Sequence, residues 1–477
     1  MTELVWPHLD ISEAATGLRQ RTFGAVELLE SHLQRIEQLD PTLNAFITRT
    51  TEQAYDAARA TDRELAAGGD IPPLGGIPLA IKDIFEMAGV RTTAGSPGLR
   101  FHIPQNDSDT VARLRLSAAS LIGKTNLDEL AFGGQSMNDV AGATLNPWDG
   151  KSVPGGSSGG SGAAVSAGMC MAATGSDTGG SIRNPSAWCG VSALKPTYGA
   201  ISPKGVLPLA WSMDTVGFFA RTVADLAILF AETADDLHDR DSVSRGQFVA
   251  ASLEPPDRPR VALISNAVEI AEPGARTAYM RAIESVRSAD IEEIAIPGLD
   301  DVVLATITIL LAEGAAAWEP YVRDGWAEFG PPVRGMIDIG RLVRAVDYLN
   351  ALRIRETIVR WVDELLGKYQ FIVMPAMGID PRPDVFAAET AVGPGSLMWE
   401  LEAKYTSAWN LTGLPVVTVP IGFTDSGWPV VTQVIGRAGT EAQVLGMARL
   451  VEMSVDLPRT ALVPTWAREQ MSKSSGD

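Results

Sequence analysis

The amino-acid sequence predicts an α/β fold built as a single large domain. The chain has 477 residues, and the 45% that are hydrophobic are enough to fill a large buried core. From about residue 72 on, short strand-like runs alternate with helix-like runs, as they do in βαβ units. Strand-like runs return near the C-terminus, and no internal repeat is visible. Because both parts of the chain supply strands, we expect one interleaved domain over residues 1–477.

The N-terminal segment, residues 1–70, is predicted to be helical. Thr22 can cap a first helix, and Pro41 is expected to stop it. Apolar residues recur in this helix at a spacing of three to four, which is typical of one buried helix face: Leu28, Leu29, Leu33, Ile36 and Leu39. A second helical stretch covers residues 51–67 and ends at the Gly-Gly-Asp run 68–70.

Residues 71–225 have a different sequence pattern, which predicts many turns and short strands. The run LGGIPLAIKDIFE (74–86) is a Gly/Pro turn followed by a short apolar strand that leads to Lys82. A helix-like run at 109–120 and a strand-like run at 121–125 come next. Loops that leave strand ends converge in α/β enzymes, so Lys82 is placed where such enzymes position their chemistry.

The middle of the chain, residues 226–368, is predicted to be mostly helical, with one strand at 260–266. The end, residues 369–477, returns to strands and closes with a helix. Its expected elements are strands at 371–377, 414–423 and 428–436, a turn at 425–429 that joins the last two into a hairpin, and a helix at 440–454.

Composition and charge restrict the possible partners and location. The net charge is −19, so we expect repulsion from nucleic acid and from anionic membranes, and no nucleic-acid or membrane partner. Cys170 and Cys189 are too few for a disulfide framework, and no Cys/His cluster suggests a metal. The first ten residues do not resemble a signal peptide, and the apolar run 302–312 is too short to cross a bilayer. We therefore expect a cytoplasmic, metal-free protein.

The Gly/Ser-rich segment 154–190 carries the strongest chemical signal. Two Gly/Ser clusters flank an apolar stretch of small residues, and DTGGS (177–181) places several backbone amides ahead of Ser181. Such amides can stabilise an oxyanion. None of the four histidines lies nearby in sequence, so Lys82 is the better base, because burial at a strand end would lower its pKa. No dinucleotide fingerprint opens a helix, so no cofactor is expected.

These motifs resemble the amidase signature family. GGSSGG opens the family's long signature at 155–186, and GSDTGGSIRNPS closes it. The lysine motif GGIPLAIKD matches as well, and the spacings of Lys82, Ser157 and Ser181 are the family's own (157 − 82 = 75 and 181 − 157 = 24). Further segments also match the family's sequences: KTNLDELAFGGQ (124–135), NPWD (146–149), LKPTYG (194–199) and NLTGLPVVTVPIG (410–422). The resemblance implies a mixed β-sheet core with helices on both faces.

The resemblance also implies a mechanism of amide hydrolysis. Ser181 would attack the amide carbonyl and form an acyl-enzyme. Ser157, after a non-proline cis peptide bond, would relay protons between Ser181 and Lys82, which would act as base and then as acid. The amides of Thr178, Gly179 and Gly180, with that of Ser181, would form the oxyanion hole. Ser158, Asp177 and Arg183 would support these groups.

The substrate is less constrained by the sequence. We expect its pocket to come from residues 125–145, 205–215, 300–350 and 375–405, and to include Gln135, Met137 and Trp211. These stretches lean apolar, which favours a small hydrophobic or aryl amide as the substrate.

Two other functions remain as alternatives. The family also contains the catalytic A subunit of glutamine-dependent aminoacyl-tRNA amidotransferases. The segments GSDTGGSIR and LKPTYG are very similar to the sequence of that subunit. A non-catalytic binding protein that kept the fold is the other alternative, although the complete Ser–Ser–Lys set argues against it. The family further implies a possible homodimer.

Overall fold

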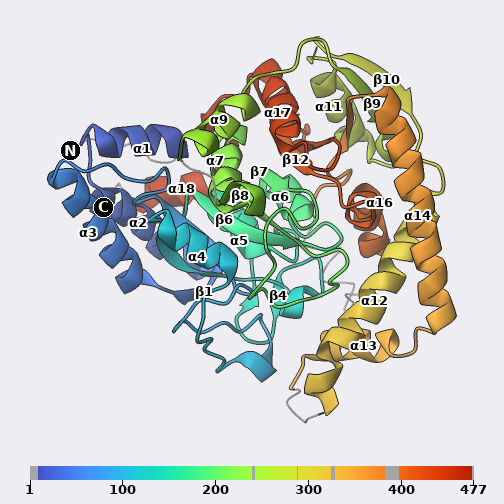
Figure 1. The fold of residues 1–477 in the computed structure, drawn as a ribbon, viewed down its shortest axis with the longest axis horizontal. Coiled ribbons are helices and arrows are strands. Elements are labelled where there is room, and N and C mark those ends of the chain that lie inside the picture. Colours follow the sequence, from blue (N-terminus) through green and yellow to red (C-terminus); the bar gives the residue numbers. More distant parts are fainter. Residues whose placement is uncertain (1–8, 239–241, 287, 324–327, 382–396, 475–477) are drawn as a thin grey trace.

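A mixed β-sheet forms the centre of the molecule (Figure 1). The computed structural model describes residues 9–238, 242–286, 288–323, 328–381 and 397–474. Within them the sheet has 11 strands, in the order β1 (Phe46–Arg49), β3 (Ser120–Thr125), β2 (Pro78–Lys82), β6 (Ala172–Asp177), β8 (Thr215–Ala220), β7 (Ser192–Lys195), β12 (Val416–Phe423), β13 (Pro429–Ile435), β11 (Phe371–Pro375), β9 (Arg260–Ile264) and β10 (Asp290–Ile294). Strands β4 (Met137–Asn138) and β5 (Gly142–Ala143) form a separate pair.

The sheet joins strands from distant parts of the chain. Strand β2 runs parallel to β3 and β6, whereas β8 is antiparallel to β6 and β7. Strand β12 pairs antiparallel with β7 on one side and with β13 on the other, so the C-terminal hairpin continues the N-terminal part of the sheet. This arrangement confirms the predicted single α/β domain and the hairpin.

Helices pack on both faces of the sheet. The N-terminal ones are α1 (Ile11–Arg19), α2 (Ala25–Leu43), α3 (Thr51–Ala66), α4 (Asp109–Leu116), α5 (Gly159–Ser166), α6 (Arg183–Cys189), α7 (Val223–Thr233), α8 (Asp235–His238) and α9 (Ser242–Ser252). The others are α10 (Ser265–Glu269), α11 (Pro273–Ile283), α12 (Leu299–Arg323), α13 (Pro331–Gly340), α14 (Ala345–Lys368), α16 (Leu397–Leu411), α17 (Glu441–Val455) and α18 (Thr465–Ser474). Helices α5 and α6 contact each other and the sheet, and α12 packs against α13, α14 and α16.

The boundaries of α2 differ from the prediction. Gly24, not Thr22, is its N-cap, and the helix passes through Pro41 before Asn44 ends it with φ 51°. The amide of Ala25 donates to the Asp62 carboxylate of α3 at 2.6 Å, so a residue remote in sequence satisfies the first turn. Pro41 has no N–H to donate to the carbonyl four residues before it, so α2 lacks one backbone hydrogen bond there.

Further differences concern short elements, and the first is strand β1, which lies within the N-terminal segment 1–70 that was predicted to be helical. The apolar stretch 163–174, which has the length of a helix, is divided between α5 and β6. Strand β10 and helix α18 were not predicted. Strand β10 reads DIEEI and lies mostly exposed at the edge of the sheet, so it lacks the apolar pattern of a buried strand.

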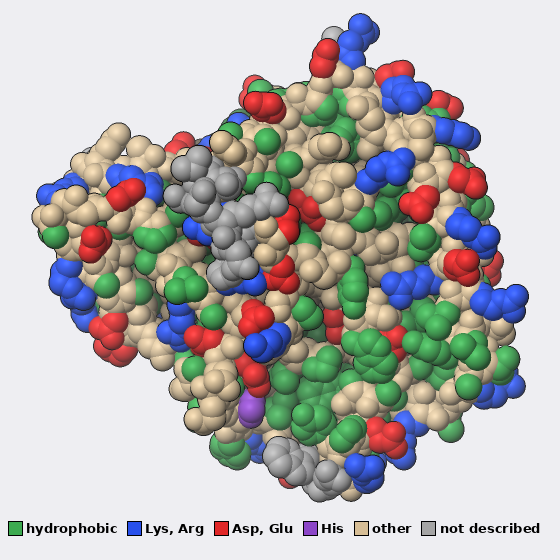
Figure 2. All heavy atoms as spheres, viewed as in Figure 1, with side chains coloured by type: hydrophobic (Ala, Val, Ile, Leu, Met, Phe, Trp, Pro, Cys, Tyr) green, Lys and Arg blue, Asp and Glu red, His purple; other side chains and the backbone are tan. Residues whose placement is uncertain are grey.

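One described helix, α12, is long and apolar enough to cross a membrane, judged by length and composition alone. Within the fold, 61% of its most apolar 18-residue stretch is buried. Hydrophobic side chains gather on the lower part of the face in Figure 2, around α12 and α13. The most exposed of the large hydrophobic residues on α12, the α13–α14 connection and α14 are Leu304, Leu342, Val346 and Leu349.

Candidate active site

Lys82 stands at the end of β2, in the interior of the molecule. Its Nζ lies 2.8 Å from Ser157 Oγ and 2.8 Å from Ser176 Oγ, and its side chain is buried. Its backbone amide donates to Thr174 Oγ1 on the neighbouring strand β6 at 2.8 Å. The strand pairing therefore fixes both the backbone and the amine of Lys82 next to the serine hydroxyls.

Burial changes the acidity of this amine. Loss of hydration lowers the pKa of Lys82, and the negative charges of Asp128, Asp177 and Asp214 raise it by a smaller amount. The resulting pKa is about 7. No hydrogen bond or ion pair joins Lys82 Nζ to a carboxylate within the described part of the chain. A substantial fraction of the amine is therefore unprotonated near neutral pH and can accept a proton.

Ser157 contacts Lys82, and its neighbour Ser158 contacts the loop that carries Ser181. The Gly156–Ser157 peptide bond is cis, as the family resemblance implied. Ser158 donates from its amide to the carbonyl of Ser181 at 3.3 Å, and its hydroxyl donates to the carbonyl of Ser176 at 3.3 Å. The start of α5 is thus tied to the loop that carries Ser181.

Ser181 is 8% exposed and lines a cavity, whereas Ser157 is fully buried and is not among the described residues that line it. No hydrogen bond joins the two hydroxyls in the described residues. Hydrogen bonds between catalytic groups are often long before substrate binds, so their absence here does not disfavour a relay.

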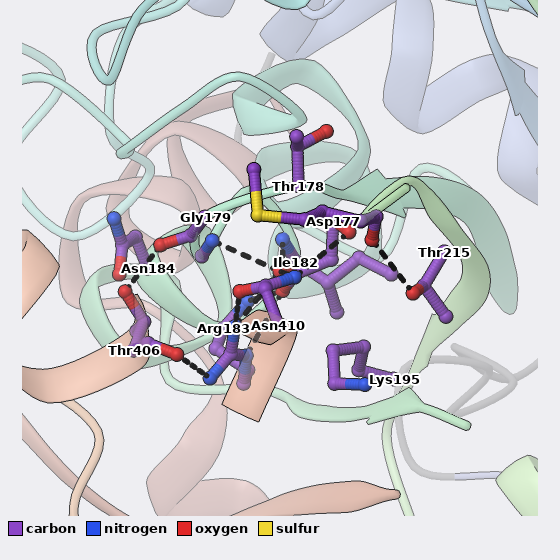
Figure 3. Close-up of polar contacts among 12 residues, drawn as sticks. Asp177, Thr178, Gly179, Ile182, Arg183, Asn184, Lys195, Thr215, Thr406 and Asn410 are labelled. Atoms are coloured by element: carbon purple, nitrogen blue, oxygen red, sulfur yellow. Dashed lines mark hydrogen bonds and ion pairs between the residues drawn. The ribbon is translucent and has the colours of Figure 1, made fainter. Parts of the chain in front are cut away.

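Asp177 organises the loop between β6 and α6 (Figure 3). Its carboxylate accepts from the amide of Gly180 at 2.9 Å and from that of Ile182 at 3.1 Å. The Gly180 amide therefore already has an acceptor, and its place in the oxyanion hole stays a prediction. The amides of Thr178, Gly179 and Ser181 have no hydrogen-bond partner among the described residues and remain the candidate donors.

Arg183 completes this support. Its guanidinium forms a fully buried ion pair with Asp177 at 2.8 Å and donates to Thr406 O at 2.8 Å and to Asn410 Oδ1 at 2.6 Å. Burial alone would raise the pKa of Asp177, but the charge and hydrogen bonds of Arg183 hold it well below its usual range. Arg183 and Asp177 therefore join the loop to α16, as Figure 3 shows.

Two glycines shape the loop. Gly180 has φ 139°, and a Cβ there would lie 2.6 Å from Thr406 Oγ1, so a larger residue is strained and crowded. A Cβ on Gly179 would meet nothing within 4 Å, because this residue faces the cavity. Thr406 Oγ1 donates to the Gly179 carbonyl, which orients that peptide.

The cavity next to Ser181 encloses about 620 Å³, its open mouth included. Its apolar wall is formed by Phe132, Leu209, Ile307, Leu310, Met336 and Ala403, which come from all four stretches expected to build the pocket. Lysine, arginine and histidine are absent from the described residues that line it, and Glu402 is the one acidic residue among them.

The three predicted pocket residues lie elsewhere. Trp211 is half exposed and lines a neighbouring cavity of about 640 Å³ that also reaches Ser176 and Asp214. Gln135 is buried, and its amide donates to Asp128 at 3.1 Å. Met137 is 52% exposed in β4. None of the three is among the described residues that line the Ser181 cavity, and a role for them in substrate binding stays a prediction.

Several residues of the site were missed by sequence reasoning: Asp128, Ser176, Glu402, Thr406 and Asn410. Ser176 directly precedes Asp177 in the signature text, and its position beside Lys82 follows the register of β6 against its neighbours. Glu402 and Thr406 stand on α16 with no motif of their own, so only the packing of α16 against the loop identifies them. No group of three or more His, Cys, Asp or Glu able to hold a metal occurs among the described residues.

Comparison with known proteins gives the family. Residues 27–445 match the amidase family. A protein of Synechococcus sp. (strain WH7803), named as one subunit of glutamyl-tRNA(Gln) amidotransferase, is 35% identical over 490 residues, covering 95% of this chain and 99% of the relative. The crystal structure of the corresponding protein from Thermotoga maritima has a TM-score of 0.74 and 31% identity, over 95% of this chain and 96% of the other.

A structure described as a vestigial protein complex that reveals the origins of an s-triazine catabolic enzyme is also similar. Its TM-score is 0.83 at 30% identity, and the match covers 93% of this chain and 98% of the other. The same fold therefore occurs in proteins whose names indicate different substrates.

The exclusion of nucleic acid from the possible partners is wrong. Relatives that match almost the whole chain are named as subunits of glutamyl-tRNA(Gln) amidotransferase. The net charge of −19 describes this chain alone, and it does not determine the charge of any assembly that contains it. These names support the alternative of an amidotransferase component better than a free-standing amidase.

The buried lysine and serines, the amide-rich loop and the match along residues 27–445 lead to one conclusion: this chain belongs to the amidase family and is an enzyme that acts on carbon–nitrogen bonds.

Proposed function

We propose that this enzyme hydrolyses the C–N bond of a small, uncharged and largely apolar amide through an acyl-enzyme on Ser181. The proposed class of substrate is supported by the cavity beside Ser181. This cavity has an apolar wall and no cationic side chain among its described lining residues. An apolar amide gains from burial there, whereas a carboxylate would lose hydration without a counter-ion.

The chemistry follows from the buried amine. Ser181 Oγ attacks the carbonyl carbon, its proton passes to Ser157 Oγ, and the Ser157 proton passes to neutral Lys82 Nζ. The carbonyl oxygen becomes an oxyanion, for which the amides of Thr178, Gly179 and Ser181 are donors. The C–N bond then breaks as the proton returns along the same path to the leaving nitrogen.

Water completes the reaction. A water molecule attacks the ester carbonyl of the acyl-enzyme and gives up its proton along the Ser157–Lys82 path. The bond between the acyl carbon and Ser181 Oγ breaks as that oxygen regains a proton. The products are a carboxylic acid and an amine or ammonia, and the enzyme returns to its starting state.

A second candidate is the hydrolysis of glutamine within an aminoacyl-tRNA amidotransferase. The names of the relatives favour it, since they are 35–37% identical over 94–96% of this chain. Glutamine carries an α-carboxylate, and the described wall of the cavity has no cation to receive it.

One experiment separates the two candidates. The purified chain is tested with glutamine and with a panel of neutral aliphatic and aryl amides, alone and mixed with extract from its own cells. Release of acid from neutral amides by the chain alone, with no glutaminase activity, is the result expected. Glutamine hydrolysis that needs a second protein, without hydrolysis of any neutral amide, would establish the second candidate instead.

A further inference from the structure

Glu402 is the buried acid of the Ser181 cavity, and the proposed mechanism does not use it. It is 4% exposed and lies in α16. A Cβ on Gly134 would lie 2.6 Å from its Oε2, so the carboxyl packs against the loop that also forms the cavity wall at Gly133. A carboxyl in this position can contact a substrate bound beside Ser181.

Glu402 is fixed relative to the oxyanion loop by the helix that carries it. Glu402, Thr406 and Asn410 are spaced four residues apart and therefore share one face of α16. Thr406 donates to the Gly179 carbonyl, and Asn410 Nδ2 donates to the Asp177 carboxylate at 2.9 Å. The same helix face thus holds the loop and presents Glu402 to the cavity.

The surroundings of Glu402 favour its neutral form. Asn184 Nδ2 donates to Glu402 Oε2 at 3.2 Å, and Oε1 has no partner within the described residues. No cation pairs with this carboxyl there, and the Asp128 carboxylate is close enough to repel a second negative charge. Burial, followed by that repulsion, raises the pKa of Glu402 well above its usual value. Since Oε2 accepts from Asn184, Oε1 is the oxygen that can carry the proton and donate when the acid is neutral.

We propose that Glu402 determines specificity by donating a hydrogen bond from Oε1 to an acceptor atom on the body of the substrate. This inference rests on the proposed function and names the substrate class more closely. The preferred amide is uncharged and apolar but carries a second acceptor, such as a ring nitrogen or a carbonyl oxygen, besides the scissile carbonyl. An apolar analogue without that acceptor would leave the buried acid without a partner.

The test uses benzamide and the three pyridinecarboxamides, which have almost the same shape and differ in whether and where the ring holds a nitrogen acceptor. Their Kd values are measured by calorimetry or NMR on Ser181→Ala, so that binding is observed without turnover. The same measurements are made with Glu402→Leu and Glu402→Gln added, and with Glu441→Gln as the control. Glu441 is a buried glutamate whose carboxyl accepts from Thr197 N and does not line the cavity.

The Ser181→Ala protein should bind at least one pyridinecarboxamide about ten- to hundredfold more tightly than benzamide, as expected for one buried hydrogen bond. Glu402→Leu should abolish this ratio, whereas Glu402→Gln should keep most of it, because its amide can accept from Asn184 and still donate. Glu441→Gln should leave the ratio unchanged.

A ratio near one for all three isomers, or a ratio that survives Glu402→Leu, would overturn the inference. So would an equal loss with Glu402→Gln, since Glu402 would then act through packing alone. Failure of the wild-type enzyme to hydrolyse any neutral amide would instead refute the proposed function, and the binding ratios would still stand as a separate result.

Discussion

The Nζ atom of Lys82 and the Oγ atom of Ser157 lie 2.8 Å apart in the interior of the protein, although 75 positions separate the two residues in the chain. Both side chains are fully buried, so solvent cannot easily replace either partner. This contact and the loop that carries Ser181 determine how the enzyme should respond to substitutions and to pH.

Removal of the proposed nucleophile or base should abolish amide hydrolysis. We expect kcat to fall by at least about a thousandfold in Ser181→Ala and nearly as much in Lys82→Ala, because residues that act as one unit give non-additive losses. The double variant should therefore be little worse than either single one, in steady-state assays with protein checked for folding by circular dichroism. A Lys82→Ala enzyme with near-normal kcat at neutral pH would contradict the assignment of the base.

Ser176 should act on the acidity of Lys82 and not on the relay itself. It accepts a 2.8 Å hydrogen bond from Lys82 Nζ, and such a bond favours the charged amine. Ser176→Ala should therefore lower the pKa of Lys82 and move the acid limb of kcat/KM to lower pH, with a loss of about tenfold or less at the plateau. Ser157→Ala is the matched comparison, and its loss should be about a hundredfold greater. Equal losses would place both serines on the proton path.

The pH dependence of kcat/KM should report the free Lys82 amine. Its pKa is lowered to about 7, and only the unprotonated form accepts a proton. The rate should therefore rise with pH, about tenfold per unit below pH 7, and level off above it. Initial rates from pH 5 to 9 with an uncharged amide would show this limb. A profile that is flat, or highest in acid, would exclude Lys82 as the base.

Asp177→Asn should destabilise the protein as well as inactivate it. The substitution leaves the buried Arg183 guanidinium without its charged partner, and loss of one member of a buried ion pair costs about 3–5 kcal/mol. Denaturant titration would measure the change in the free energy of unfolding. The exposed pair Arg344–Asp347 provides the control, since Asp347→Asn should leave the unfolding midpoint unchanged. A similar small effect at both sites would show that the buried pair does not support the loop.

Much of the fold could be predicted because its signals are local. The short apolar strand before Lys82 and the C-terminal hairpin each carry their pattern in a few consecutive residues, and the structure has both. The ends of α2 could not be predicted in this way, since Asp62 of another helix binds its first amides. The edge strand β10 was missed because its composition lacks an apolar face.

The sequence by itself determined the reactive groups: the lysine, the two serines and the glycine-rich loop, at spacings that match one family. The tertiary structure decided which backbone amides are free, because Asp177 occupies that of Gly180 and only the folded loop brings them together. It also decided the environment of Lys82 and placed Glu402 in the cavity wall. Acidity and hydrogen bonding depend on which atoms surround a group, and those neighbours come from strands and helices far apart in the chain.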